Sequence, residues 1–163
     1  MRQVFWNKPI FQEDIQNRLQ VLKQLAVIFS QHHITWALGS SGMLFFHGLV
    51  DTFHDLDIMV LNSQVETVRL ILQHQGTVHE SPPHPMYQTK HFIELVVDEV
   101  EIDIMADLTV NGFPYPLDPE EIDHFVELEG CRIPLHKMEN WLTIYRAIGR
   151  LEKVQIIEKY LKK

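Results

Sequence analysis

Three aspartates each interrupt an apolar stretch of this sequence. Asp55 and Asp57 open the run DLDIMVL at residues 55–61, and Asp103 lies inside the run VEIDIMADLTV at residues 100–110. Because side chains alternate between the two faces of a β-strand, Asp55 and Asp57 are expected on one face, with the apolar residues that follow each of them on the other. If the two runs form neighbouring strands, Asp103 lies beside this pair.

Three carboxylates in such proximity would bind divalent cations. Like charges repel one another, and an unpaired charge near an apolar core costs several kcal/mol, so a cation would relieve both costs. Carboxylate and water oxygens suit Mg²⁺, which proteins bind through a few carboxylates together with substrate phosphates. Two such ions about 4 Å apart can activate an attacking oxygen and stabilise a leaving one. The alternative is that the acids lie on a solvated sheet face or pair with Arg or Lys.

A glycine–serine pair precedes the aspartates at a predicted strand-to-helix turn. Gly39 and Ser40 follow the β-prone run ITWAL at residues 34–38, and a short helix is predicted at residues 40–47. Glycine lets another group approach the backbone, and the free N–H groups at a helix start attract phosphate. The sequence around the pair is neither a Walker loop nor a G-x-G-x-x-G dinucleotide motif. Taken alone, the pair is equally consistent with an ordinary capped turn.

Apolar periodicity predicts the helices that support these residues. A helix is predicted at residues 11–31, where one apolar stripe follows helical spacing. The stripe consists of Ile15, Leu19, Leu22, Ala26 and Phe29. A second helix is predicted at residues 63–75, with Ser63 as its cap and Glu66 completing a capping box.

Alternation and turn residues predict the strands and loops. Strands are predicted at 34–38, 55–61, 77–80, 90–97 and 100–110, with hairpins turning at Asp98-Glu99 and, within 124–136, at Glu129-Gly130. Proline-rich loops are predicted at 81–85 and 111–119, and two helices at about 138–148 and 150–162. This order predicts a single α/β (α+β) domain over residues 1–163, in which helices flank a mixed β-sheet and a helix pair at about 138–162 packs on it.

Composition restricts the class of protein further. The formal net charge of −8 argues against extended DNA binding, which depends on a basic surface. The single cysteine, Cys131, cannot form an internal disulfide, which fits a reducing cytoplasm. The chain has no signal-peptide pattern and no apolar run near the roughly 20 residues that span a bilayer, so no membrane association is expected. The ten histidines show no H-x-x-x-H pair, which disfavours zinc.

The order of Gly39-Ser40, Asp55-x-Asp57 and Asp103 resembles the DNA-polymerase-β-like nucleotidyltransferase superfamily. That superfamily has Gly-Ser at a strand-to-helix turn, Asp-x-Asp on the next strand and a third carboxylate on a later strand. The C-terminal segment AIGRLEKVQIIEKYL is also similar to small single-domain bacterial members of the minimal nucleotidyltransferase type. The resemblance extends from about residue 20 to residue 163 and implies the nucleotidyltransferase fold.

The resemblance implies a magnesium-dependent transfer of a nucleoside monophosphate from a nucleoside triphosphate to an acceptor hydroxyl. Asp55, Asp57 and Asp103 would be the catalytic residues and would hold Mg²⁺, or alternatively Mn²⁺, with Asp103 also orienting or deprotonating the acceptor. The residues that would bind the nucleotide phosphates are Gly39, Ser40 and Ser41. The acceptor, whether a small molecule, an RNA end or a protein, is not identified by the sequence.

The source of positive charge is the main departure from that pattern. No lysine or arginine occurs between residues 24 and 68, so a side-chain cation for the triphosphate must come from elsewhere. Arg146, Arg150 and Lys153 could form a basic stripe that reaches the site, or an ordinary solvated helix face. The alternative function is therefore a catalytically weak or inactive nucleotide- or partner-binding protein, for example one half of a toxin–antitoxin-like pair. Acceptor recognition could also require a partner protein or a homo-oligomer.

Overall fold

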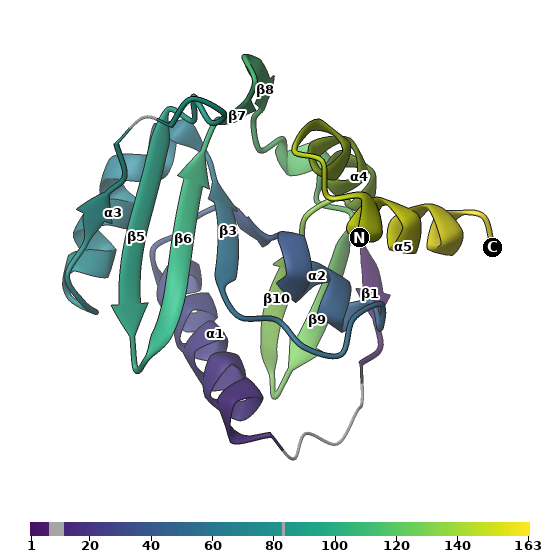
Figure 1. Ribbon diagram of the computed structural model, residues 1–163. Helices are drawn as coiled ribbons and strands as arrows, with labels where there is room; N and C mark the ends of the chain where they lie inside the picture. The colour runs from purple at the N-terminus through teal and green to yellow at the C-terminus, as the bar shows by residue number, and fades with distance from the viewer. Residues whose placement is uncertain (7–11, 83) are drawn as a thin grey trace.

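The computed structural model describes residues 1–6, 12–82 and 84–163. Within these residues, eight strands form one mixed sheet in the order β1-β9-β10-β2-β3-β6-β5-β4 (Figure 1). Their bounds are β1 Arg2–Val4, β2 Trp36–Leu38, β3 Leu56–Val60, β4 His79–Glu80, β5 His91–Val97, β6 Val100–Ala106, β9 His124–Leu128 and β10 Cys131–Leu135. A separate two-stranded sheet is formed by β7 Leu108–Val110 and β8 Phe113–Tyr115.

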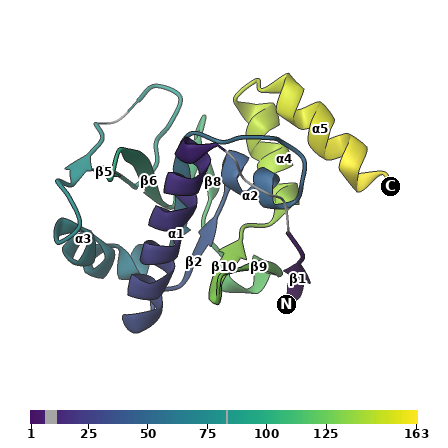
Figure 2. The same cartoon turned by 90° about the horizontal axis from the view of Figure 1, so that it is seen from below.

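The helices cover both faces of the large sheet. Their bounds are α1 Glu13–Gln31, α2 Ser40–Phe46, α3 Val65–Gln73, α4 Met138–Ala147 and α5 Leu151–Leu161. Figures 1 and 2 together show α1 and α3 on one face, and α2 with the α4–α5 pair on the other. The mixed α+β architecture and the C-terminal helix pair agree with the fold predicted from the sequence.

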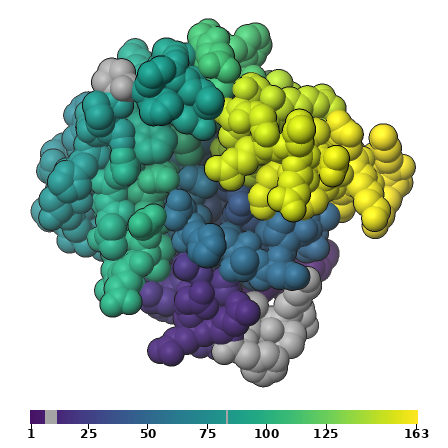
Figure 3. Space-filling view, viewed as in Figure 1, coloured from purple at the N-terminus to yellow at the C-terminus, as the bar shows by residue number. Residues whose placement is uncertain are grey.

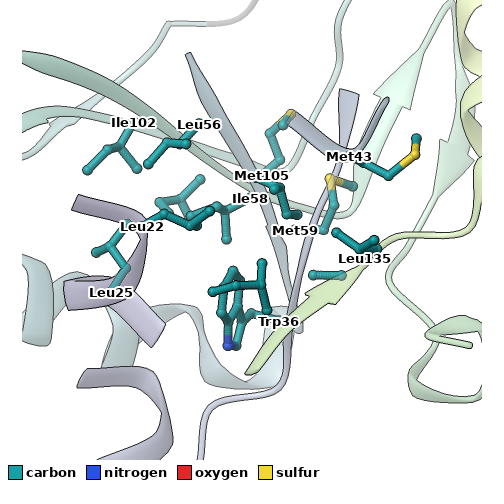
Figure 4. Packing of buried hydrophobic residues seen from close by; sticks show 14 of the residues in the cluster. Leu22, Leu25, Trp36, Met43, Leu56, Ile58, Met59, Ile102, Met105 and Leu135 are labelled. Carbon is teal, nitrogen blue, oxygen red and sulfur yellow. The ribbon is translucent and has the colours of Figure 1, made fainter. Parts of the chain in front are cut away.

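The core determines which way the strands present their acidic residues. The whole predicted stripe of α1 is buried. In the close-up of Figure 4, Leu22 and Leu25 of α1 face Leu56 and Ile102 of the adjacent strands β3 and β6. Residues that alternate with these in each strand must point to the opposite face, toward α2 and α4. Apolar packing against α1 therefore places Asp57 on that opposite face.

The second predicted helix starts later than expected. Residues Asn62–Gln64 form a 3₁₀ turn, and α3 begins at Val65 with no side-chain cap. The Gln64 side chain instead spans to the preceding segment, accepting from the Thr35 backbone N–H and donating to the His33 carbonyl. Glu66 pairs with Arg69. The capping-box prediction was therefore wrong, because tertiary contacts of Gln64 and not the Ser63 hydroxyl define this helix start.

The run at residues 100–110 is also interrupted. Asp107 adopts a left-handed backbone with φ 55°, which ends β6 and starts β7 on a new course. Beyond it, Asn111 and Gly112 have φ 50° and 80° and connect β7 to β8. These angles are those of a type I′ turn, for which Asn-Gly is the preferred sequence. The predicted proline-rich loop at 111–119 was thus partly wrong, because it begins with a β-hairpin.

The other turns agree with the predictions. The hairpins turn at Asp98-Glu99 between β5 and β6, and at Glu129-Gly130 between β9 and β10. Gly149 separates α4 from α5 with φ 76°. Within the described part of the chain, no helix is both long enough and apolar enough to cross a membrane.

Candidate active site

The two central aspartates lie directly opposite each other in the sheet. β3 and β6 are adjacent and parallel, and their register pairs Asp57 with Asp103. Burial, followed by the charge of Asp55, raises the pKa of Asp57 to about 6, although a hydrogen bond from Ser40 opposes the shift. Burial, followed by the charges of Asp57 and Asp55, raises the pKa of Asp103 to about 8. The structure thus brings all three predicted aspartates within mutual electrostatic range.

Asp55 lies at the rim of this group, one residue before β3. The Asp55 carboxyl, through a side-chain hydrogen bond and its charge, raises the pKa of the exposed Glu101. Among the described residues, no three His, Cys, Asp or Glu side chains converge as a complete metal site. A cation held at this position would have the Asp57–Asp103 pair and the neighbouring Asp55 as protein donors, and water or substrate oxygens would have to complete its coordination.

This donor set fits Mg²⁺ or Mn²⁺. Hard carboxylate oxygens are the ligands these ions prefer, and Mg²⁺ commonly keeps several waters or phosphate oxygens alongside one or two carboxylates. The raised pKa values of Asp57 and Asp103 reflect burial and repulsion that a divalent cation would offset.

The glycine–serine turn lies against the same aspartates. The Gly39 backbone N–H donates to the Asp57 carbonyl at 2.8 Å, which joins the end of β2 to β3. A Cβ atom added to Gly39 would lie 2.4 Å from Cζ2 of Trp141, so close packing alone requires glycine here. Ser40 has φ 55°, an unusual left-handed backbone for a non-glycine residue. Ser40 and Ser41 both line the cleft described below.

Helix α4 covers this turn with two aromatic residues that sequence analysis did not identify. The Tyr145 hydroxyl lies 3.0 Å from Ser40 Oγ, and Tyr145 is otherwise buried. The Trp141 indole N–H donates to His136 Nδ1 at 2.8 Å. Burial lowers the pKa of His136 to about 4, so its ring is neutral and accepts this bond. Their four-residue spacing in α4 was a signal in the sequence, but it is equally typical of a core helix face.

Positive charge reaches the site from the C-terminal helices. Arg150, immediately before α5, and Lys153 in its first turn both line the cleft. Arg150 is near enough to Asp57 to lower the pKa of that carboxyl. Arg146 instead pairs with Glu158 at 2.6 Å and is not part of the lining. The basic stripe considered from the sequence is therefore divided: two of its members face the site and one does not.

A cleft of about 1060 Å³ contains these groups. Figure 3 shows the hollow between the teal and green segments and the yellow C-terminal helices, with blue residues at its floor. Beyond the aspartates, the cleft continues over β5 and β6, where Phe92, Glu94 and Met105 contribute to its lining. In the antiparallel register Glu94 lies opposite Asp103 and Phe92 opposite Met105, so one open sheet face carries an acidic row beside an apolar row. Phe92 and Glu94 were not identified from the sequence, although the hairpin predicted to turn at Asp98-Glu99 already implies that they lie opposite Met105 and Asp103.

Comparison with known proteins identifies similar structures. TM1012 of Thermotoga maritima, an inferred nucleotidyltransferase, matches with a TM-score of 0.70 and 25% sequence identity over 90% of this chain and 94% of that chain. The lincomycin-bound lincosamide antibiotic adenylyltransferase LnuA matches with a TM-score of 0.57 and 15% identity over 85% and 95%. ANT(2")-Ia in complex with adenylyl-2"-tobramycin matches with a TM-score of 0.58 and 8% identity over 88% and 89%. No protein-family model and no curated protein sequence matches the chain.

Proposed function

We propose that this chain, which has the nucleotidyltransferase fold, transfers a nucleoside monophosphate from a nucleoside triphosphate to an acceptor hydroxyl in a magnesium-dependent reaction. The observation that carries the proposal is the direct pairing of Asp57 with Asp103 in a cleft that also contains the glycine–serine turn. The similar structures support nucleotidyl transfer as the class of reaction. LnuA is a lincosamide antibiotic adenylyltransferase, and ANT(2")-Ia was solved with adenylyl-2"-tobramycin.

Asp55, Asp57 and Asp103 are the proposed ligands of Mg²⁺, for which Mn²⁺ is the alternative. When bound, the metal supplies charge neutralisation for the triphosphate and for the departing pyrophosphate. Asp103 in its ionised form is also proposed to orient the acceptor hydroxyl and to accept its proton, which its position on the side of the pair next to β5 and the rest of the cleft supports. The acceptor oxygen attacks the α-phosphorus and pyrophosphate leaves, with no covalent protein intermediate.

The phosphates are proposed to lie between the glycine–serine turn and α5. The hydroxyls of Ser40 and Ser41 would donate to phosphate oxygens, and the close-packed Gly39 keeps the turn against the aspartates. Arg150 and Lys153 would supply the cations that residues 24–68 lack. Helix α2 has only seven residues, so its N-terminal partial charge is not part of the proposed phosphate site. The proposed binding depends on the side chains named above.

The acceptor is proposed to be a small hydroxyl compound that binds over β5 and β6. Phe92 and Met105 offer an apolar surface next to the proposed reacting carboxylates. The Glu94 side chain beside them has no ion pair or hydrogen bond within the described residues. A nucleic-acid acceptor would bring phosphates toward Glu94 and Asp103, and like charges would oppose it. These features favour a neutral or cationic small molecule over an RNA end.

An inactive or partner-binding role is the competing proposal. The small size of the chain and the lack of local cations motivated it, and the position of Arg150 and Lys153 in the cleft weighs against the second of these grounds only. A partner protein or a homo-oligomer remains a prediction that only a solution measurement can test.

Transfer of label from α-³²P-labelled triphosphates to candidate acceptors tests the proposed function. With Mg²⁺, we expect the wild-type chain to label a hydroxyl acceptor and the Asp57→Asn and Asp103→Asn variants to lose at least about 100-fold in rate, a typical effect of removing charge stabilisation at a reacting centre. Asp51→Asn is the matched control, because Asp51 is an exposed aspartate just outside the cleft. Equal labelling by Asp103→Asn would contradict the assignment, and triphosphate binding without any transfer would favour the inactive role.

A further inference from the structure

Tyr145 makes a contact that packing alone does not require. Its side chain is 2% exposed and its ring packs against Trp141, with centroids 5.6 Å apart. A phenylalanine would fill this position equally well. The hydroxyl, however, reaches the edge of the cleft, where it lies 3.0 Å from Ser40 Oγ. The phenol therefore contacts a serine of the proposed phosphate site.

Ser40 connects Tyr145 with the aspartate pair. Its Oγ lies 3.0 Å from the Tyr145 hydroxyl, and either oxygen can be the donor. The Ser40 hydroxyl also interacts with the Asp57 carboxyl, where it favours the ionised form. When Asp57 is ionised its carboxylate can only accept, so in that state Ser40 donates to Asp57 and its oxygen accepts from the Tyr145 hydroxyl.

Ser40 needs such support because its backbone is strained. A left-handed φ of 55° is sterically unfavourable for a non-glycine residue, because its Cβ approaches the backbone. The turn is held from above by α4, since Trp141 packs on Gly39 and is itself fixed by its bond to His136. The His136 backbone N–H donates to the Leu38 carbonyl at 2.8 Å, which ties the start of α4 to the strand before the turn. Among Trp141, His136 and Tyr145, it is Tyr145 that contacts the Ser40 hydroxyl.

We propose that Tyr145 is a positioning residue, which holds the Ser40 hydroxyl at the phosphate side of the cleft so that a triphosphate can replace Asp57 as the acceptor of its hydrogen bond. This inference rests on the proposed function. In the free protein the Ser40 hydrogen points to Asp57, and in the complex it turns to a phosphate oxygen while Tyr145 continues to donate to Ser40 Oγ. Through this bond the C-terminal helix α4 determines how the turn at Gly39–Ser41 binds phosphate.

Binding of inorganic tripolyphosphate with Mg²⁺, measured by calorimetry, tests the inference without reference to the nucleobase. We expect Tyr145→Phe to weaken binding about 5- to 20-fold, in the range of one hydrogen bond to a charged group. Ser40→Ala should weaken binding at least as much, and the double variant should bind no more weakly than Ser40→Ala alone. Tyr115→Phe is the matched control, because Tyr115 is a partly buried tyrosine that does not line the cleft.

The outcomes separate the inference from the function on which it rests. If the wild-type chain does not bind tripolyphosphate, the proposed function fails, and the role of Tyr145 fails with it. If the wild type binds but Tyr145→Phe binds equally well, or weakens binding to the same extent in the Ser40→Ala background, only the positioning role is overturned. Thermal melting establishes that Tyr145→Phe is folded. Should it not be folded, Ser40→Ala decides alone, because unchanged binding by that variant would show that the positioned hydroxyl is not used.

Discussion

Asp103 shows how a single residue can bear on both stability and activity. Its pKa of about 8 lies well above the ordinary value of 3.8, because burial and then the charges of Asp57 and Asp55 disfavour ionisation. The folded chain therefore holds this proton more tightly than the unfolded chain does. The resulting stabilisation is complete below about pH 4 and is lost as the pH rises through about 8.

We predict that Asp103→Asn stabilises the metal-free protein at pH 8 by on the order of 1 kcal/mol, a figure reduced for the partial exposure of this side chain. The variant should also flatten the fall in stability between pH 4 and pH 8. Urea denaturation in EDTA at several pH values measures this. With Mg²⁺ present the wild type should become more stable than Asp103→Asn, since metal binding stabilises only the wild type. A wild type whose midpoint is the same in EDTA and in Mg²⁺ would argue against a metal site at this position.

The turn of the β5–β6 hairpin has a strained backbone. Its two turn residues, Asp98 and Glu99, have φ 49° and 68°, a type I′ geometry for which Asn-Gly or Asp-Gly is preferred. A glutamate at the second position is strained by its Cβ. The turn is nevertheless required, because it sets the register that brings Glu94 opposite Asp103.

We predict that Glu99→Gly stabilises the chain by about 1 kcal/mol, because glycine adopts positive φ without steric cost. The matched reverse substitution is Gly130→Ala in the β9–β10 turn, where φ is 84° and no atom lies within 4 Å of the added Cβ. It should destabilise by a similar amount through backbone strain alone. Chemical denaturation of both variants measures the pair. A neutral Glu99→Gly together with a costly Gly130→Ala would mean that Glu99 has a compensating contact.

At the scale of the whole molecule, the cleft joins distant parts of the chain. The aspartates and the glycine–serine turn come from the central strands, whereas Arg150 and Lys153 come from the C-terminal helix pair. Figure 3 shows the yellow C-terminal helices on one side of the hollow, with the teal and green segments on the other and the blue segment at its floor. The aspartates therefore meet Arg150 and Lys153 only in the folded protein.

We predict that Arg150→Gln and Lys153→Gln each weaken binding of magnesium tripolyphosphate about 5- to 20-fold, with a smaller effect at high salt because these side chains are solvent-accessible. Arg146→Gln is the matched control, since its partner is Glu158 and it does not line the cleft. Calorimetric titrations at low and high ionic strength compare the three. An equal loss in Arg146→Gln would point to net charge and not to position.

Local patterns sufficed to predict most elements and the candidate carboxylates. Period-two alternation predicted that Asp57 lies on the face opposite Leu56 and Ile58, and the apolar stripe of α1 predicted the helix that packs on the apolar residues. Asp55, predicted on the same face as Asp57, lies before the strand begins. The Asn111-Gly112 hairpin could also have been predicted, because Asn-Gly is a strong type I′ signal, but the neighbouring prolines favoured a loop. The start of α3 could not, since it depends on side-chain contacts of Gln64 with the distant residues His33 and Thr35.

By itself, the sequence determined that three aspartates and a glycine–serine turn occur in a strand–helix–strand context, because backbone geometry relates neighbouring residues directly to faces and turns. Only the tertiary structure decided that Asp57 pairs with Asp103, that Tyr145 contacts Ser40, and that Arg150 faces the aspartates while Arg146 does not. Strand register and helix packing bring together residues far apart in the chain, and they are set by the burial of the whole apolar core, which no local pattern contains.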